Sequence, residues 1–106
     1  MGQQEGTMKV FVSQPMAGKT DEEIVEGRRK AYAYMRERYG KDITLIDSYF
    51  PGYSVMNPCY CLGEAIKKLA QCDIVVFLPG WDKARGCLIE HECAKQYSIA
   101  YILMED

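Results

Sequence analysis

Short apolar runs along this chain alternate with longer stretches in which apolar residues recur at helical spacing. The short runs are rich in Val, Ile and Phe, which is typical of β-strands, and the longer stretches are typical of α-helices. The predicted strands cover residues 9–13, 43–46, 73–78 and 99–103, and the predicted helices cover 20–39, a segment from Pro58 with Leu62, Ile66 and Leu69 on one face, and 87–97. The run 73–78 is apolar throughout after its first residue, which indicates a central parallel strand buried on both faces.

Capping residues mark where two of these helices begin. Thr20 with Glu23 three residues later forms a capping-box pattern, and Gly40 is a natural helix stop. Asn57 followed by Pro58 combines an N-cap with a first-turn proline. These signals support the helix positions independently of the apolar spacing.

Strands and helices therefore alternate along the whole chain, in the order βαβαβαβ. Right-handed crossovers turn this order into an α/β fold, a small parallel sheet with helices on both faces. Ligands of such sheets bind at the carboxyl ends of the strands, where the loops 13–19, 47–53 and 79–86 are predicted to meet. A sheet this small often pairs across subunits, so we expect a homo-oligomer.

Composition narrows the class of protein further. The chain has 106 residues, enough for one core, with 13 Lys and Arg against 15 Asp and Glu. A net charge of −2 predicts neither a nucleic-acid nor a membrane partner. Residues 1–8 read as a polar extension with no apolar signal segment, before a single domain at 9–106. Five cysteines, an odd number, then favour reduced thiols in the cytoplasm.

The most informative segment for chemistry is Gly86-Cys87-Leu88-Ile89-Glu90. It places a carboxylate about one turn into a helix that begins at the ligand edge, where the helix dipole favours the ionised form. Such a carboxylate can act as a nucleophile toward a sugar carbon, and Gly86 would let the backbone approach a ligand. The structural alternative is that Glu90 only satisfies the start of its helix.

Metal binding is not expected. His91 is the one histidine and could pair with Cys87 on a helix, but a closed zinc site lacks its remaining ligands. Cys59 and Cys61 are too closely spaced for a usual metal motif. No cofactor is predicted.

The loops carry weaker signals. Ser13 and Lys19 bracket a loop that could cradle an anion, although it is neither a Walker loop nor GxGxxG. Arg85 could bind a phosphate or carboxylate, or be a surface cation. Trp81 and the aromatic loop around Tyr49 could stack on a base, or cover the end of the sheet.

Two segments resemble a known superfamily. Residues 9–18, KVFVSQPMAG, resemble the opening of the nucleoside 2-deoxyribosyltransferase-like superfamily, in particular its small DUF4406 branch. Residues 72–94 resemble its second signature, a strand and a variable loop followed by glycine, glutamate and alanine at fixed spacing. Gly86, Glu90 and Ala94 match those three positions.

The resemblance implies a flavodoxin-like, three-layer α/β/α fold with four or five parallel strands, assembled into dimers or higher oligomers. It implies an enzyme that cleaves or exchanges the bond between a base and a deoxyribose, with Glu90 as nucleophile. Ser13, Gln14, Met16 and Gly18 would hold the sugar or its 5′ end. Arg85 would hold a phosphate.

The chain departs from the superfamily at two acids. Transferases carry aspartates at positions that are Ala65 and Ala84 here. Asp82 or Asp47 is therefore expected to assist the leaving base, and Trp81 or Tyr49 to stack on it. The expected partner is a nucleoside or nucleotide, cleaved by hydrolysis or transfer. The alternative reading, which the lost aspartates favour, is a nucleotide-binding module without catalysis.

Overall fold

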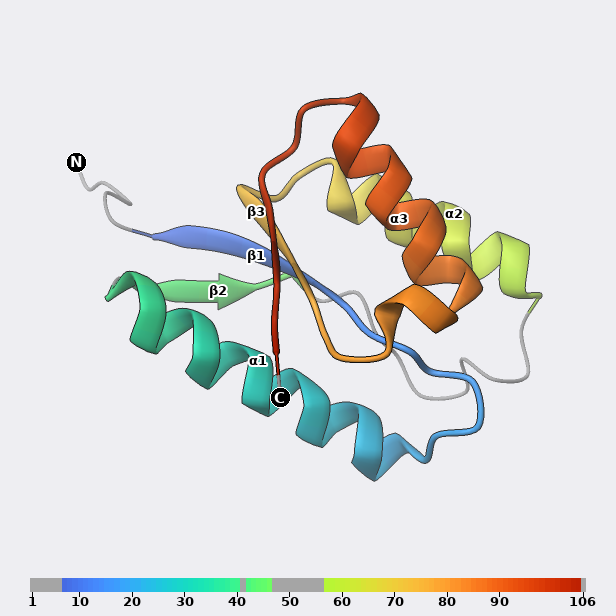
Figure 1. Cartoon of the computed structure of the whole chain (residues 1–106), viewed down its shortest axis with the longest axis horizontal. Helices are drawn as coiled ribbons and strands as arrows, with labels where there is room; N and C mark the ends of the chain where they lie inside the picture. Colours follow the sequence, from blue (N-terminus) through green and yellow to red (C-terminus); the bar gives the residue numbers. More distant parts are fainter. Residues whose placement is uncertain (1–6, 41, 47–56, 106) are drawn as a thin grey trace.

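The computed structural model describes residues 7–40, 42–46 and 57–105. Eight elements follow one another within these residues (Figure 1). They are β1 (Met8–Ser13), α1 (Asp21–Tyr39), β2 (Ile43–Leu45), α2 (Pro58–Leu69), β3 (Ile74–Phe77), the 3₁₀ turn η2 (Trp81–Lys83), α3 (Arg85–Gln96) and β4 (Tyr101–Leu103). Strands and helices alternate as the sequence predicts.

The four strands form one parallel sheet in the order β2-β1-β3-β4. The register pairs Val10 with Ile74 and Ser13 with Phe77, so β1 and β3 run together at the centre. All four residues of β3 are buried, which confirms the prediction of a central strand. The fold is a small flavodoxin-like α/β fold, with four strands in the described part of the chain.

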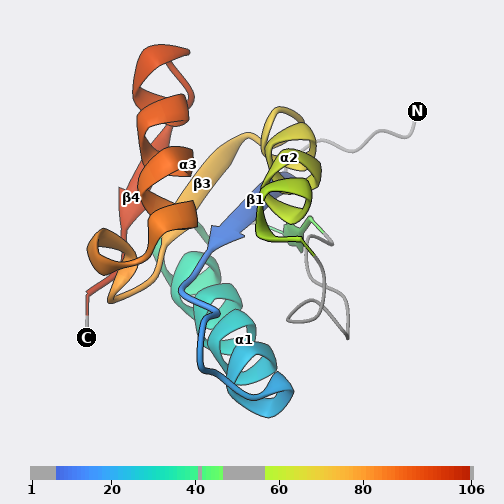
Figure 2. The same ribbon diagram turned by 90° about the vertical axis from the view of Figure 1, so that its right-hand side faces the viewer.

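Helices cover both faces of this sheet. Figure 2 shows α1 on one side and α2 and α3 on the other. Alternation along β1 separates the two cores, because successive side chains of a strand point to opposite faces. Val10 and Val12 pack with Ala31 and Met35 of α1. Phe11 packs on the other face with a cluster that includes Ala65 and Leu69 of α2.

The helix ends follow the predicted signals. Thr20 and Glu23 form both hydrogen bonds of the capping box, at 3.1 and 2.8 Å. Gly40 takes a left-handed conformation, with φ of 60°. The Asn57 side chain accepts hydrogen bonds from the backbone at the start of α2. Strand β1 begins at Met8, one residue earlier than predicted, and Met8 pairs with Ile43 in the sheet.

The buried face of α2 differs from the prediction. Its fully buried residues are Cys61, Ala65 and Leu69, whereas Leu62 and Ile66 are half-buried. The helix is turned so that Cys61 and Ala65 are buried together with Leu69, and Leu62 lies near Gly86 at the start of α3. None of the helices in the described residues is long and apolar enough to cross a membrane.

Candidate functional site

A cleft opens at the carboxyl ends of β1 and β3. These neighbouring strands lead to helices on opposite faces of the sheet, so the loops after them diverge and leave a space. The space is about 1210 Å³, ample for a nucleotide-sized ligand. Its walls come from the loop after β1, the start of α1, the start of α2, and the segment from Pro79 into α3.

Glu90 lies in this cleft and is held by Ser13. The Ser13 hydroxyl donates a hydrogen bond of 2.6 Å to Oε1 of Glu90. Ser13 is 1% exposed and Glu90 is 7% exposed. Only Glu90 of the two lines the cleft. The carboxyl group is therefore almost dry, yet borders the space where a ligand would lie.

Burial raises the pKa of Glu90 to about 7, and the hydrogen bond from Ser13 acts in the opposite direction. The expectation that the helix dipole would favour the ionised form of Glu90 is wrong, because burial raises the pKa by more than the other effects lower it. Glu90 is the sixth residue of α3, and the dipole effect fades beyond the first turn, so desolvation dominates. Near neutral pH the group is divided between its two protonation states.

Cys87 is the third member of this cluster, one turn before Glu90 on α3. It is buried and lines the cleft. Burial raises the pKa of the Cys87 thiol to about 11; the Ser13 hydroxyl opposes this rise and the charge of Glu90 adds to it. The thiol therefore keeps its proton at neutral pH, and a cysteine nucleophile is not favoured here.

Cations surround the cleft. Lys19, Lys83 and Arg85 all line it, and Asp21 also lines it, as does Glu90. In the described part of the chain these two acids are the only carboxylates in the lining. No motif in the sequence singles out Asp21 or Lys83, and only the fold indicates that both reach the cleft.

The predicted loop residues have structural contacts of their own. The Gln14 side chain lines the cleft, and its Nε2 donates to the carbonyl of Ile24 on α1 at 3.1 Å. Met16 and Gly18 also line the cleft. Gly18 has φ of 78° in a turn closed by Lys19 N to Met16 O at 3.1 Å, so the turn itself requires glycine. Whether these residues hold a sugar stays a prediction.

Trp81 and Asp82 lie on η2 and do not line the cleft. Trp81 instead stacks on His91, with ring centroids 4.5 Å apart, and contacts Phe77. These contacts fit the sheet-covering alternative, and base stacking by Trp81 stays a prediction. Asp82 is exposed. The two other predicted residues, Asp47 and Tyr49, lie outside the described residues.

Arg85 and Gly86 both line the cleft, as predicted for ligand-binding residues. A Cβ atom on Gly86 would meet only Leu62, at 3.9 Å, so the protein itself leaves room for a side chain there. The predicted close approach of a ligand would be the reason for glycine.

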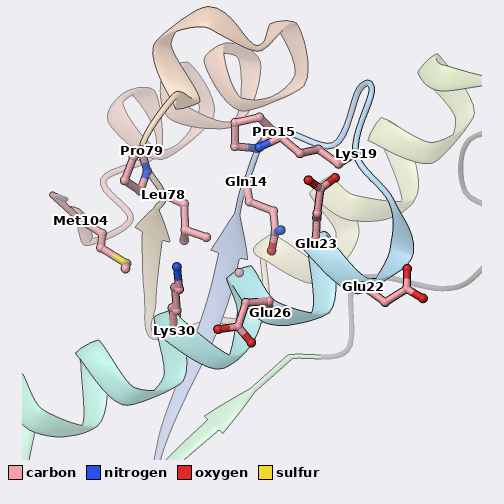
Figure 3. Close-up of a pocket in the computed structure, with 11 residues that line it drawn as sticks. Gln14, Pro15, Lys19, Glu22, Glu23, Glu26, Lys30, Leu78, Pro79 and Met104 are labelled. Atoms are coloured by element: carbon pink, nitrogen blue, oxygen red, sulfur yellow. The ribbon is translucent and has the colours of Figure 1, made fainter.

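A smaller groove of about 450 Å³ lies on the other side of the loop after β1 (Figure 3). It shares Gln14, Pro15, Lys19 and Pro79 with the cleft. Its acids come from the first turns of α1, as Figure 3 shows for Glu22, Glu23 and Glu26. Across residues 7–40, 42–46 and 57–105, no group of three or more His, Cys, Asp and Glu could hold a metal ion.

The sheet order and the cleft define a small flavodoxin-like α/β protein with a buried carboxyl group at its ligand edge. The family model of DUF4406, a domain of unknown function, matches residues 8–103. The chain therefore belongs to the DUF4406 family. Comparison with curated proteins and comparison with solved structures each found no match.

Proposed function

We propose that this protein cleaves or exchanges the N-glycosidic bond of a nucleoside or nucleotide, with Glu90 as the nucleophile. The observation that carries the proposal is the buried Glu90 carboxyl, held by a hydroxyl group at the wall of a nucleotide-sized cleft. A dry carboxylate attacks carbon more readily than a hydrated one, because no shell of water has to be removed first. The resemblance to the nucleoside 2-deoxyribosyltransferase-like superfamily supports the same chemistry.

The reaction has two steps. A carboxylate oxygen of Glu90 forms a bond to the anomeric carbon while the bond from that carbon to the base nitrogen breaks. The electron pair goes to the base nitrogen, which takes up a proton. Water, or a second base, then attacks the same carbon and loses a proton, and the glycosyl ester breaks to return the Glu90 carboxylate. These outcomes are hydrolysis and transfer, respectively.

The charges in the cleft support a 5′-monophosphate as substrate. Lys19, Lys83 and Arg85 supply three cations, against Asp21 and Glu90 as the carboxylates of the described lining. Arg85 would bind the phosphate, since guanidinium groups pair with it in bidentate geometry. Asp21 is the other carboxylate in the described lining of the cleft, and we assign it the proton for the leaving base.

The test is base release from a panel of nucleosides and 5′-monophosphates, followed by chromatography. Glu90→Gln is compared with the wild type, each with and without a second free base. Glu92→Gln is the matched control, because Glu92 lies on the same helix but is exposed and bonded to Gln96. We expect Glu90→Gln to lose at least about a thousandfold in rate, and the control to keep it. An unchanged rate in Glu90→Gln would overturn the role of Glu90.

Binding of a nucleotide with no release from any substrate would instead establish the non-catalytic module. Assembly into a homodimer or larger homo-oligomer and a cytoplasmic location are part of the same proposal. Size-exclusion chromatography with light scattering tests the first, and fractionation of the source cells tests the second.

A further inference from the structure

We propose that Ser13 is a positioning residue for Glu90: its hydroxyl holds Oε1 and leaves Oε2 as the oxygen that attacks the sugar. This inference rests on the proposed function. It changes the role that the resemblance implies for Ser13, which is contact with the substrate. The structure assigns the hydroxyl to a protein partner instead.

The backbone of Ser13 is held by its pairing with strand β3. Ser13 ends β1 and pairs with Phe77 in the register of β3. Its carbonyl accepts a hydrogen bond of 2.9 Å from the backbone N–H of Leu78. A hydroxyl on such a rigid position fixes its partner well, because little movement of its own strand can lengthen the contact.

Strand alternation explains why the hydroxyl faces α3. Phe11, two residues earlier, packs on the face that α2 and α3 cover, and Ser13 follows it on that face. An apolar residue would be ordinary at a site that is 1% exposed. A buried hydroxyl needs a hydrogen-bond partner to offset its lost hydration, and Glu90 is that partner.

The Ser13 hydroxyl has only one proton to donate. This proton is donated to Oε1 of Glu90. Ser13 could therefore donate to a substrate only by releasing Glu90. Among the described residues, no hydrogen bond reaches Oε2.

Other titratable groups also face the cleft around Glu90. They come from the loop after β1, from the starts of α1 and α2, and from the segment into α3. They are Lys19, Asp21, Cys59, Lys83, Arg85 and Cys87. All of them are retained when Ser13 alone is changed, so a change in the titration of Glu90 reports the loss of one hydrogen bond.

The first readout is the titration of the Glu90 carboxyl carbon by NMR in the substrate-free protein. It is measured in wild type, Ser13→Ala, Ser13→Cys and Ser13→Thr, with thermal melts to show that each is folded. In the Ala variant we expect the midpoint to rise by about one pH unit, since the hydrogen bond that favours the carboxylate is gone. The midpoint should also rise in the Cys variant, because a thiol is similar in size to a hydroxyl but is a weak donor. The Thr variant should match the wild type.

The second readout is base release as a function of pH. In Ser13→Ala we expect kcat near neutral pH to fall about tenfold or more, KM to change less than about twofold, and the acid limb to move with the NMR midpoint. Ser13→Thr should restore kcat. If the Ala and Cys variants titrate like the wild type, or if KM rises while kcat and the midpoint stay, Ser13 is not a positioning residue.

The two proposals fail in different ways. If the wild type releases no base, the proposed function fails and the catalytic role of Ser13 fails with it, while the NMR titration still reports whether Ser13 controls Glu90. If the wild type releases base through Glu90 but the variants keep its titration and kcat, only the inference about Ser13 fails.

Discussion

The cleft and the smaller groove are adjacent hollows with a shared wall, and both contain carboxyl groups. In the cleft, Glu90 is buried, is held by a neutral hydroxyl and has a pKa raised by burial to about 7. In the groove, Glu26 is exposed, and its hydrogen bond and ion pair with Arg29, at 2.6 Å, lower its pKa. Glu23 beside it accepts from the backbone of Thr20.

The difference separates carboxylates that stabilise a helix from a carboxyl group kept for chemistry. Glu23 and Glu26 lie within the first turns of α1 and have local partners, the Thr20 backbone and Arg29. Glu90 has no charged partner that shifts its pKa. Its carboxylate form therefore lowers the free energy of unfolding of the protein. The cleft is the candidate site because, among the described residues, it contains a buried carboxyl group without a charged partner, and the groove has a hollow shape without such a group.

The largest expected effect is on stability as a function of pH. A pKa raised from 4.5 to about 7 means that the unfolded chain ionises first. The wild type therefore loses about 2 to 3 kcal/mol of unfolding free energy, from this group alone, as pH rises from about 5 to about 8. Glu90→Gln should lack that loss, so its free energy of unfolding should increase relative to the wild type as pH rises. Urea unfolding at both pH values measures this difference.

Glu26→Gln is the matched variant in the groove, and its sign is opposite. The lowered pKa of Glu26 stabilises the fold above the unfolded pKa and is lost as pH falls. We expect a small relative loss of stability at the higher pH. Equal pH dependence in the two Gln variants would break the distinction between the cleft and the groove.

The next effect concerns the proton for the leaving base. Asp21 lines the cleft and Asp82 does not, so Asp21→Asn should lower base release about a hundredfold and Asp82→Asn should change it little. Both acids are exposed. Steady-state rates over a range of pH make the comparison. If only Asp82→Asn lowers the rate of base release, Asp82 and not Asp21 supplies the proton, as the sequence predicted.

A smaller effect is expected from Gly86→Ala. The added methyl group would meet only Leu62, at an ordinary contact distance of 3.9 Å, so the fold should tolerate it. If a ligand approaches this backbone, its affinity should fall about tenfold. Calorimetric titration with the best substrate or its 5′-monophosphate measures this. Unchanged affinity in a folded variant would place the ligand elsewhere in the cleft.

The smallest effect compares two helical glycines. Gly63 on α2 has open space around it, and Gly63→Ala should stabilise by about 1 kcal/mol. On Gly27, at the groove, a Cβ would lie 2.8 Å from Nε2 of Gln14, which is bonded to Ile24. We therefore expect no increase in the free energy of unfolding for Gly27→Ala, as measured by urea unfolding. An equal gain would show that the Gln14 amide moves at no cost.

Much of the fold could be predicted because its signals are local. The capping box at Thr20 and Glu23, the stop at Gly40 and the cap at Asn57 each depend on residues within about one turn. The buried run of β3 identifies the centre of the sheet by composition alone. The buried face of α2 was predicted only in part. Leu69 is buried and Ile66 packs against the same cluster, but apolar spacing did not show that Cys61 and Ala65 are more deeply buried than Leu62.

The sequence by itself determined the order of the elements, the parallel sheet and the place of Glu90 about one turn into a helix that begins at the ligand edge. Tertiary structure alone decided what surrounds that carboxyl group. Ser13 and Glu90 are 77 residues apart and meet only because β1 and α3 pack together. The same packing places Trp81 on His91 and Asp21 in the cleft. Desolvation depends on every neighbour in space, and neighbours along the chain cannot supply it.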